Sequence, residues 1–329
     1  RKKDSITYLG VLLDQSWLFT QQAKKIAKKA SSVMRAMQRV NRATWGVGFK
    51  TMNVIYEGAF LPTLLYGACM WYERVEQTHI KRTIRAEQRA ALLAATAAYR
   101  TTSWLALVAL CGKLPAERML RVRGQVEEGR YDLRVEGTRT SPKEKRVQAR
   151  SLERTLRSEA WENWQHEWEN DHRGVRTRRF IPDVKEWALT EKKVGMHMSG
   201  YITGHMGVNS FLRRVGAADT DLCPCGEVET VDHVVWNCQI YQEERSSLIA
   251  ELGDADPSDL KVGSTYRAIG KAIQSIMDRP RFVEPADSEQ DPHEPEEVEA
   301  EQRAGEAAVA DGPPQALERV SGGRVCHGR

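Results

Sequence analysis

Three cysteines and a histidine stand close together in the sequence, in the order Cys223-Pro-Cys225-Gly, His233 and Cys238. Their spacing is C-x-C-x7-H-x4-C. Thiolate and imidazole groups in this number match a closed tetrahedral zinc site, which leaves no position for water and so favours a structural role over a catalytic one. The spacing therefore predicts Zn²⁺ bound by Cys223, Cys225, His233 and Cys238. The alternative is three buried thiols beside an unrelated histidine.

A second signal is a basic segment without acids. No Asp or Glu lies between Gln15 and Tyr56, whereas that window contains Lys24, Lys25, Lys28, Lys29, Arg35, Arg39, Arg42 and Lys50. Such a helix face can follow a phosphate backbone, and we expect contacts from Lys24, Lys28, Arg35 and Arg39. A merely solvated helix face and a helix lying on an anionic membrane stay open as alternatives.

The sequence contains no familiar catalytic motif such as G-x-S-x-G, H-E-x-x-H or G-x-x-x-x-G-K. Asp254, Asp256 and Asp259, with Lys261, superficially resemble nuclease carboxylates, but acids in a turn are usually solvated. The stripe Trp161, Trp164 and Trp168 could stack on bases. At helical spacing, however, a tryptophan stripe more often belongs to a core.

Length and charge limit the class of protein. A chain of 329 residues corresponds to about two compact units. The net charge of +4 conceals an acidic segment, because residues 284–329 hold twelve acids and four arginines, which leaves 45 basic and 33 acidic residues before it. A basic body favours a polyanionic partner. The longest apolar run, Trp104 to Cys111, has eight residues, whereas a membrane helix needs about 20.

Hydrophobic periodicity predicts a mainly α fold. Residues 6–13 suit a buried strand or a hairpin arm, and helices are expected over 77–99, 103–110, 116–126 and 152–168, with Pro62 as a kink or boundary within 52–71. From Thr20, a core-facing stripe comprises Ile26, Ala30, Val33, Met37 and Val40. Cys69 and Cys111 lie in apolar runs and are predicted to be core residues.

Composition suggests the following division. Residues 129–151 are rich in Arg, Lys, Gly, Thr and Ser and are interpreted as a charged connector, and residues after Met277 lack the apolar content of a core. The predicted parts are 1–14 with the strand, 15–128 helical, the connector 129–151, 152–250 with the zinc knuckle 223–238, a helical extension 251–283 and a disordered acidic tail 284–329.

Taken together, these residues resemble the C-terminal part of the Pol polyprotein of type-1, non-LTR retrotransposable elements, especially the insect clade that inserts into ribosomal RNA genes. The similarity is carried by Tyr8-Leu-Gly10-Val-Leu-Leu-Asp14, Ile55-Tyr56, Leu61-Pro62, Leu65-Tyr-Gly67-Ala68, Trp71, Gly112-Lys-Leu-Pro115, Thr203-Gly-His205, Phe211-Leu-Arg213, Val215-Gly216 and the Cys/His cluster with Glu229-Thr230. It covers roughly residues 4–250, and His205 belongs to the lead-in and not to the four zinc ligands.

The resemblance implies a reverse transcriptase primer grip at Tyr8 and Gly10, where Gly10 lets backbone approach the primer end, followed by a thumb-like helical domain. It implies that the parent polyprotein is an RNA-directed DNA polymerase with an associated endonuclease, acting in target-primed insertion on an RNA template and a DNA primer or target. The polymerase aspartates and their Mg²⁺ are expected upstream of Arg1, so the fragment alone should not polymerise. The implied location is the nucleus after synthesis in the cytoplasm, although no targeting signal is seen.

Three functions stay open. The favoured one is a nucleic-acid-binding thumb and zinc knuckle of a retroelement polymerase, with no membrane partner. The others are a zinc-stapled protein-interaction module and a C-terminal nucleic-acid-binding endonuclease region. Salt-dependent nucleic-acid binding separates the first from the second, and metal-dependent cleavage would establish the third.

Overall fold

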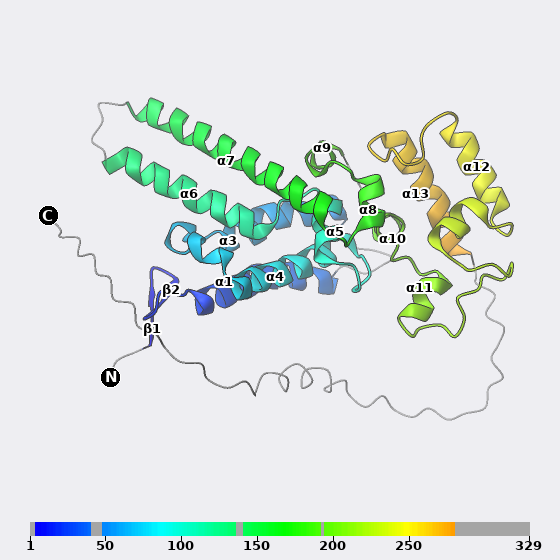
Figure 1. Cartoon of the computed structure of the whole chain (residues 1–329), viewed down its shortest axis with the longest axis horizontal. Helices are drawn as coiled ribbons and strands as arrows, with labels where there is room; N and C mark the ends of the chain where they lie inside the picture. The colour runs from blue at the N-terminus through cyan, green and yellow to red at the C-terminus, as the bar shows by residue number, and fades with distance from the viewer. Residues whose placement is uncertain (1–3, 41–47, 136–140, 192–193, 280–329) are drawn as a thin grey trace, which may run out of the picture. The chain divides into compact units, whose positions relative to one another are not determined.

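The computed structural model describes residues 4–40, 48–135, 141–191 and 194–279. The described residues all belong to one compact unit, and residues 280–329 lie outside the described ranges. The predicted disordered acidic tail therefore falls outside the description. The described chain is mainly helical, as expected, with one two-stranded antiparallel sheet near its start (Figure 1).

The described secondary structure begins with the hairpin strands and is otherwise helical. The elements in the first half are β1 (Ser5–Tyr8), β2 (Val11–Asp14), α1 (Thr20–Val40), α2 (Phe49–Ile55), the π-helix η1 (Tyr56–Phe60), α3 (Leu61–Leu64), the 3-10 helices η2 (Ala68–Met70) and η3 (Tyr72–Glu76), α4 (Thr78–Thr96) and α5 (Trp104–Leu110). The elements in the second half are α6 (Ala116–Val135), α7 (Pro142–Asn170), α8 (Val175–Phe180), α9 (Val184–Leu189), α10 (Met196–Thr203), α11 (Asn209–Arg214), the π-helix η4 (His233–Asn237), α12 (Gln242–Leu252) and α13 (Gly263–Asp278).

The N-terminal strands form a tight hairpin and not a buried strand. Tyr8 pairs with Val11 across a two-residue turn, and both turn residues have positive φ, 46° at Leu9 and 84° at Gly10. Gly10 adopts this conformation without strain because it lacks Cβ. Of the two alternatives for residues 6–13, the hairpin arm is the one present, since Tyr8 is 63% exposed while Val11 is 6% exposed.

Helices α1 and α4 pack along each other and run in the same direction. The Thr20 hydroxyl is 2.8 Å from Nε2 of His79, and Ser31 further along donates to Glu87. The buried face of α1 is formed mainly by Ala23, Ala27, Ala30 and Met34. Val33, expected in the core stripe, is 37% exposed. The register of burial is therefore rotated slightly from the prediction, because the small alanines allow α4 to approach.

Tryptophans and one apolar helix form the centre of the core. Helix α5 is buried at every position from Leu105 to Leu110, as a helix that is apolar on all sides must be. Trp164 and Trp168 of α7 are fully buried, with Trp164 5.9 Å from the ring of Trp104. The interpretation of the tryptophan stripe as core is confirmed for these two residues, and Trp161 is partly buried.

The segment expected as a charged connector is largely helical. Helix α6 continues to Val135 and α7 begins at Pro142, so both sides of the undescribed residues 136–140 belong to a helical hairpin. Ser141 caps α7 through a capping box with Glu144. The two helices approach closely at Gly129, where an added Cβ would lie 2.6 Å from Leu152. The domain limits proposed around this segment stay predictions.

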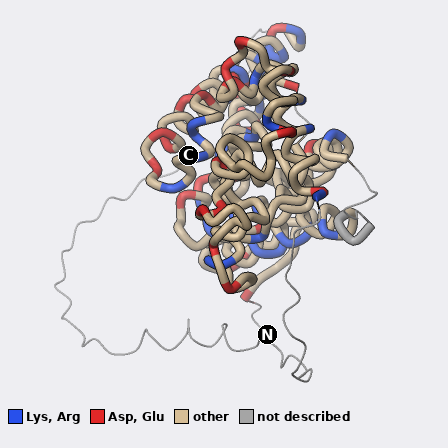
Figure 2. Tube along the Cα trace, turned by 90° about the vertical axis from the view of Figure 1, so that its right-hand side faces the viewer, with Lys and Arg blue, Asp and Glu red and all other residues tan. Residues whose placement is uncertain are grey.

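Charged residues of both signs are interspersed over the described chain (Figure 2). A region of continuous positive charge must therefore be identified from particular helix faces. Among the described helices, none combines the length and the apolar character needed to cross a bilayer.

Candidate metal centre and nucleic-acid interface

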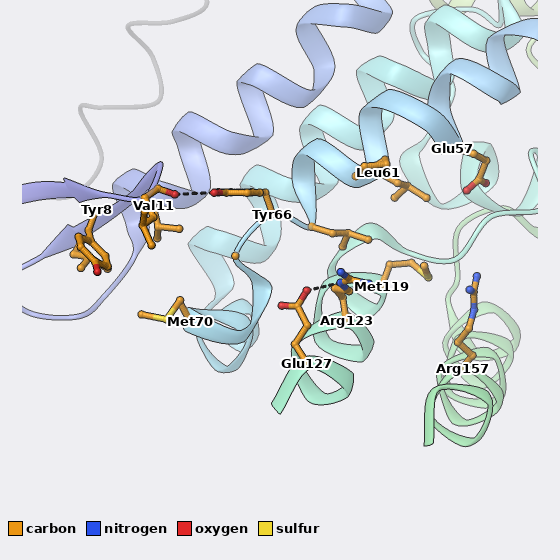
Figure 3. A pocket seen from close by; sticks show the side chains of 15 residues that line it. Tyr8, Val11, Glu57, Leu61, Tyr66, Met70, Met119, Arg123, Glu127 and Arg157 are labelled. Carbon is orange, nitrogen blue, oxygen red and sulfur yellow. Dashed lines mark hydrogen bonds and ion pairs between the residues drawn. The ribbon is translucent and has the colours of Figure 1, made fainter. Parts of the chain in front are cut away.

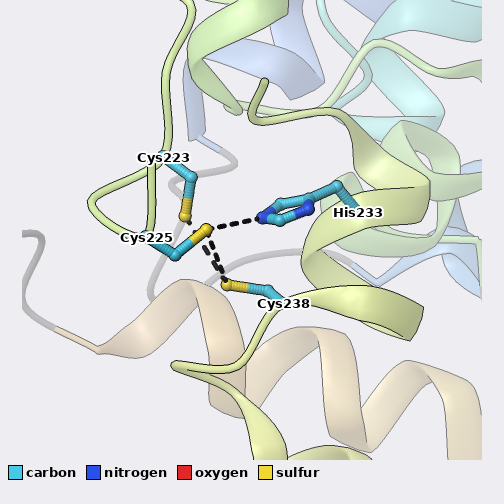
Figure 4. Close-up of side chains that lie close together, drawn as sticks. All are labelled: Cys223, Cys225, His233 and Cys238. Carbon is cyan, nitrogen blue, oxygen red and sulfur yellow. Dashed lines mark hydrogen bonds between the residues drawn. The ribbon is translucent and has the colours of Figure 1, made fainter. Parts of the chain in front are cut away.

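The four residues predicted from spacing converge in space. The ligand atoms of Cys223, Cys225, His233 and Cys238 all lie within 4.8 Å of one another (Figure 4). Sγ of Cys238 is 3.5 Å from Sγ of Cys223 and 3.8 Å from Sγ of Cys225, and Cys225 Sγ is 3.2 Å from Nε2 of His233. Tetrahedral zinc with bonds of about 2.3 Å to sulfur requires sulfur atoms about 3.8 Å apart. The donor set therefore fits structural Zn²⁺.

A compact turn presents the first two cysteines. Leu222 pairs with Val228 in an isolated antiparallel bridge, and the backbone N–H of Cys223 donates to the carbonyl of Glu227 at 2.7 Å. Gly226 has φ of 94°, a conformation that a side chain would strain. The turn therefore directs both thiols to one side, towards η4 and the residue that follows it.

The histidine and the last cysteine stand at the two ends of η4. The preceding residue, Asp232, forms a two-point ion pair with Arg176 of α8, at 2.7 and 2.9 Å. Arg245 of α12 donates to the Cys238 carbonyl at 2.6 Å. Neighbouring helices thus hold both ends of η4, which is how outer contacts orient metal ligands.

The thiols differ in their surroundings. Burial raises the pKa of the Cys223 thiol to about 12, whereas the backbone N–H of Glu227 lowers the pKa of Cys225. A coordinating divalent cation deprotonates thiols outright. A bound metal would therefore remove the difference and make all three cysteines thiolate ligands.

His205 lies outside the cluster of Cys223, Cys225, His233 and Cys238. Its Nδ1 is 2.8 Å from the Thr101 hydroxyl, and its ring packs at 5.3 Å from Phe211. Phe211 in turn contacts Tyr99. The segment before the knuckle is thereby attached to the loop between α4 and α5.

The basic face of α1 is exposed. Lys24, Lys25, Lys28 and Lys29 are solvent-accessible and make no ion pair with any residue that the structure describes. Arg35 differs, because its Nη1 lies 2.8 Å from Glu87 and its side chain is 38% exposed. Arg39 belongs to α1, but its side chain lies outside the description. Lys25 and Lys29 extend the face beyond the predicted residues. The absence of acids from this segment is the sequence feature that indicates their part in the basic face.

The hairpin borders a cavity of about 690 Å³. Its lining includes Tyr8, Tyr66, Met70, Arg123 and Arg157, from the hairpin, the turn after α3, η2, and helices α6 and α7 (Figure 3). The Tyr66 hydroxyl donates to the Leu9 carbonyl at 2.8 Å. Tyr8 is therefore at the edge of a cavity. Gly10 is required by the turn itself and by Tyr66, whose ring would lie 3.3 Å from an added Cβ.

The possible nuclease acids do not converge. Lys261 binds Glu186 at 2.9 Å, and Asp256 accepts hydrogen bonds from Ser258. In the described ranges, the Cys/His cluster is the one group of three or more potential ligands close enough to share an ion. Of the two remaining described cysteines, Cys111 is buried as expected, whereas Cys69 is exposed and its prediction as a core residue is wrong.

Comparison with curated proteins gives relatives of one kind. The chain is 30% identical over 256 residues to a Pol polyprotein of a type-1 retrotransposable element R1 of Nasonia vitripennis, covering 76% of this chain and 64% of that protein. It is 29% identical over 248 residues to a putative 115 kDa protein in the type-1 element R1DM of Drosophila melanogaster, covering 73% of this chain and 24% of that protein.

A third relative is an R1 Pol polyprotein of Bradysia coprophila, 26% identical over 268 residues and covering 78% of this chain and 26% of that protein. This chain thus spans from about a quarter to under two thirds of the length of these curated relatives. No family model matches the chain. No solved structure matches it either.

Proposed function

We propose that this chain is a nucleic-acid-binding section of a Pol polyprotein. The proposal starts from its homology to the Pol polyproteins of type-1 R1 retrotransposable elements. The whole protein would copy RNA into DNA at a nicked target, with a polymerase that uses Mg²⁺ and an associated endonuclease, in the nucleus. In this section, α1 would contact the template-primer or the element's RNA, and the Cys/His cluster would bind structural Zn²⁺.

The observation that carries the proposal is the α1 lysine face, defined as Lys24, Lys25, Lys28 and Lys29. Its members are exposed and lack a carboxylate partner among the described residues. Four uncompensated charges over about 8 Å of helix attract a polyanion and release its counterions on binding. Arg35 is a weaker candidate, because Glu87 already neutralises it.

Salt titration tests this role. Replacing all four lysines of the face with Gln should reduce the magnitude of the log–log salt slope for RNA or DNA binding by roughly 3, at 0.7 to 0.9 per lost contact. The matched control replaces four exposed cations on other elements, Arg74, Arg100, Lys185 and Arg267. Equal slopes for the wild type and the lysine-face variant would refute the role of α1.

Zinc would hold together the segment from Cys223 to Cys238. It would supply the charge that keeps three thiolates close, and Arg176 and Arg245 would fix the chain around it. Metal analysis of reduced protein should give one zinc per chain. Cys238→Ser should lose it, whereas Cys69→Ser, at an exposed cysteine outside the cluster, should retain it.

A zinc-stapled protein-interaction module is the second candidate. Leu222 and Val228, paired across the bridge beside the cluster, are 45% and 46% exposed. Exposed apolar neighbours of this kind suit a protein contact better than a phosphate contact. Binding of a protein partner that is insensitive to salt and is lost in Leu222→Ser would favour this function.

A further inference from the structure

The outer face of α7 carries a row of positive charges. Lys143, Arg146, Arg150, Arg154 and Arg157 follow one another at steps of three or four residues. At 100° per residue they fall within about 80° of one another, so they form a single stripe, which we call the α7 ridge. All five are exposed. The ridge extends for about 21 Å at 1.5 Å per residue.

The charges of the ridge are largely uncompensated. Glu153, at its border, contacts Arg157 at 3.8 Å and Arg130 of α6 at 3.6 Å, so one carboxylate serves two arginines. Lys143, Arg146 and Arg150 have no ion-pair partner in the described part of the chain, and neither has Arg154. A solvated helix usually alternates its charges, which this face does not do.

The ridge ends at the cavity beside the hairpin. Arg157 is the last cation of the ridge and also lines the cavity. Arg123 of α6 lines the same cavity (Figure 3). On another side of the same cavity lie the exposed rings of Tyr8 and Tyr66. Aromatic rings beside a track of cations are the elements with which proteins bind single strands.

We infer that the α7 ridge binds the phosphate backbone of a nucleic-acid strand that runs along the helix towards the cavity beside Tyr8. The spacing suits this ligand, since successive cations lie about 4.5 to 6 Å apart along the helix axis. In a duplex, the phosphates of one strand advance by about 3.4 Å, so the ridge covers roughly six of them.

The inference rests on the proposed function only in that the ligand is a nucleic acid, because the ridge is on α7 and not on α1. The ridge variant carries Lys143→Gln, Arg146→Gln, Arg150→Gln and Arg154→Gln, and leaves Arg157 and the α1 lysine face intact. Binding of labelled single-stranded RNA, single-stranded DNA and duplex DNA is measured against salt, which also identifies the preferred form.

In the ridge variant, the magnitude of the log–log salt slope for binding the preferred nucleic acid should fall by about 3, because four phosphate contacts are lost. A charge-retaining variant, Arg146→Lys with Arg150→Lys and Arg154→Lys, should keep the slope, and the scattered control at Arg74, Arg100, Lys185 and Arg267 should keep most of it. Zinc content and the helical circular dichroism signal confirm that each variant folds.

Several results would overturn the inference. One is an unchanged slope in the ridge variant, and another is an equal loss in the scattered control, which would make net charge the cause. Binding of the ridge to anionic vesicles but to no nucleic acid would assign it to a membrane. If the salt slope falls in the α1 lysine-face variant but not in the ridge variant, the proposed function stands and the ridge is not a second binding surface.

The direction of the strand has its own test. A photoreactive residue placed at Arg150, and separately at Tyr8, should crosslink one end-labelled oligonucleotide at positions several nucleotides apart and in a constant order. Crosslinks from the two positions to the same nucleotide, or from Arg150 alone, would contradict the path towards the cavity.

Discussion

Arg176 and Asp232 are joined by two parallel hydrogen bonds, Nη1 to Oδ2 at 2.7 Å and Nη2 to Oδ1 at 2.9 Å, and Asp232 is followed directly by the metal-binding candidate His233. Arg176 also donates through Nε to the carbonyl of Tyr201 in α10. One guanidinium therefore connects α8, α10 and the start of η4. Its planar fork cannot be reproduced by an ammonium group.

Arg176→Ala should weaken zinc binding about tenfold, since contacts that orient ligands influence metal affinity to this extent. Arg176→Lys should recover little of it, because lysine cannot make both bonds. Competition with a coloured chelator measures the affinity. Arg121→Ala, which breaks an exposed pair with Glu76, is the matched control and should leave affinity unchanged. Equal affinities in all four proteins would exclude a positioning role for Arg176.

Acid should remove a contribution of Asp171 to stability. Hydrogen bonds from Arg173 lower the pKa of Asp171 to about 2, whereas an unfolded Asp titrates near about 3.9. Since the folded pKa is the lower one, this stabilisation is present above about pH 4 and is lost as pH falls towards about 2. Asp171→Asn should therefore flatten the fall in the free energy of unfolding over this range. Urea denaturation measures it, and the exposed Asp132→Asn serves as the control.

Gly67→Ala should destabilise the docking of the hairpin. Gly67 has φ of 64°, and an added Cβ would lie 2.7 Å from Cγ2 of Val11. The left-handed conformation alone costs a residue with Cβ about 1–2 kcal/mol, and the overlap adds to this cost. Gly58→Ala meets open space within η1 and should not destabilise the protein, because Ala is favoured over Gly inside a helix by about 0.5–1 kcal/mol. Urea midpoints that coincide for the two variants would contradict this account.

Trp164→Ala should reduce the free energy of unfolding by about 3–5 kcal/mol, because the side chain is fully buried and packs against Trp104 and Trp168. Trp161→Ala, one turn earlier and partly buried, should cost less. Nucleic-acid binding by Trp161→Ala should be unchanged if this stripe is core. Similar destabilisation by both substitutions would show that the burial of Trp161 is as complete as that of Trp164.

The features predicted correctly from sequence are those with a local cause. The four Cys/His residues are close in the chain, so their spacing alone indicated the cluster, and the 3.6-residue period placed α1 with its lysines outward. The prediction that Val33 is buried was wrong, because its exposure depends on how closely α4 approaches the alanines of α1. Cys69 was assigned to the core from its apolar neighbours, although a 3-10 turn directs it outward.

The prediction of a charged connector over residues 129–151 was wrong for a different reason. Charged residues and Gly129 suggested a loop, yet a long exposed helical hairpin also needs polar residues on most of its surface. Gly129 marks close helix packing against Leu152 there, which depends on a residue more than twenty positions later. The same interpretation missed the α7 ridge, although its period of three and four residues was present in the sequence.

The complete burial of α5 affects how the chain folds during its synthesis. Its six buried apolar positions pack against α4, which precedes it, and against the later helices α9 and α10. The carbonyl of Leu110 accepts a hydrogen bond from the indole of Trp187, 77 residues further on. At a synthesis rate of about 5–20 residues per second, roughly 4–15 seconds pass between the emergence of the two. During that interval an apolar helix is on the ribosome without the part of its cover that α9 and α10 supply. The nascent chain is then a substrate for chaperones that bind exposed apolar segments.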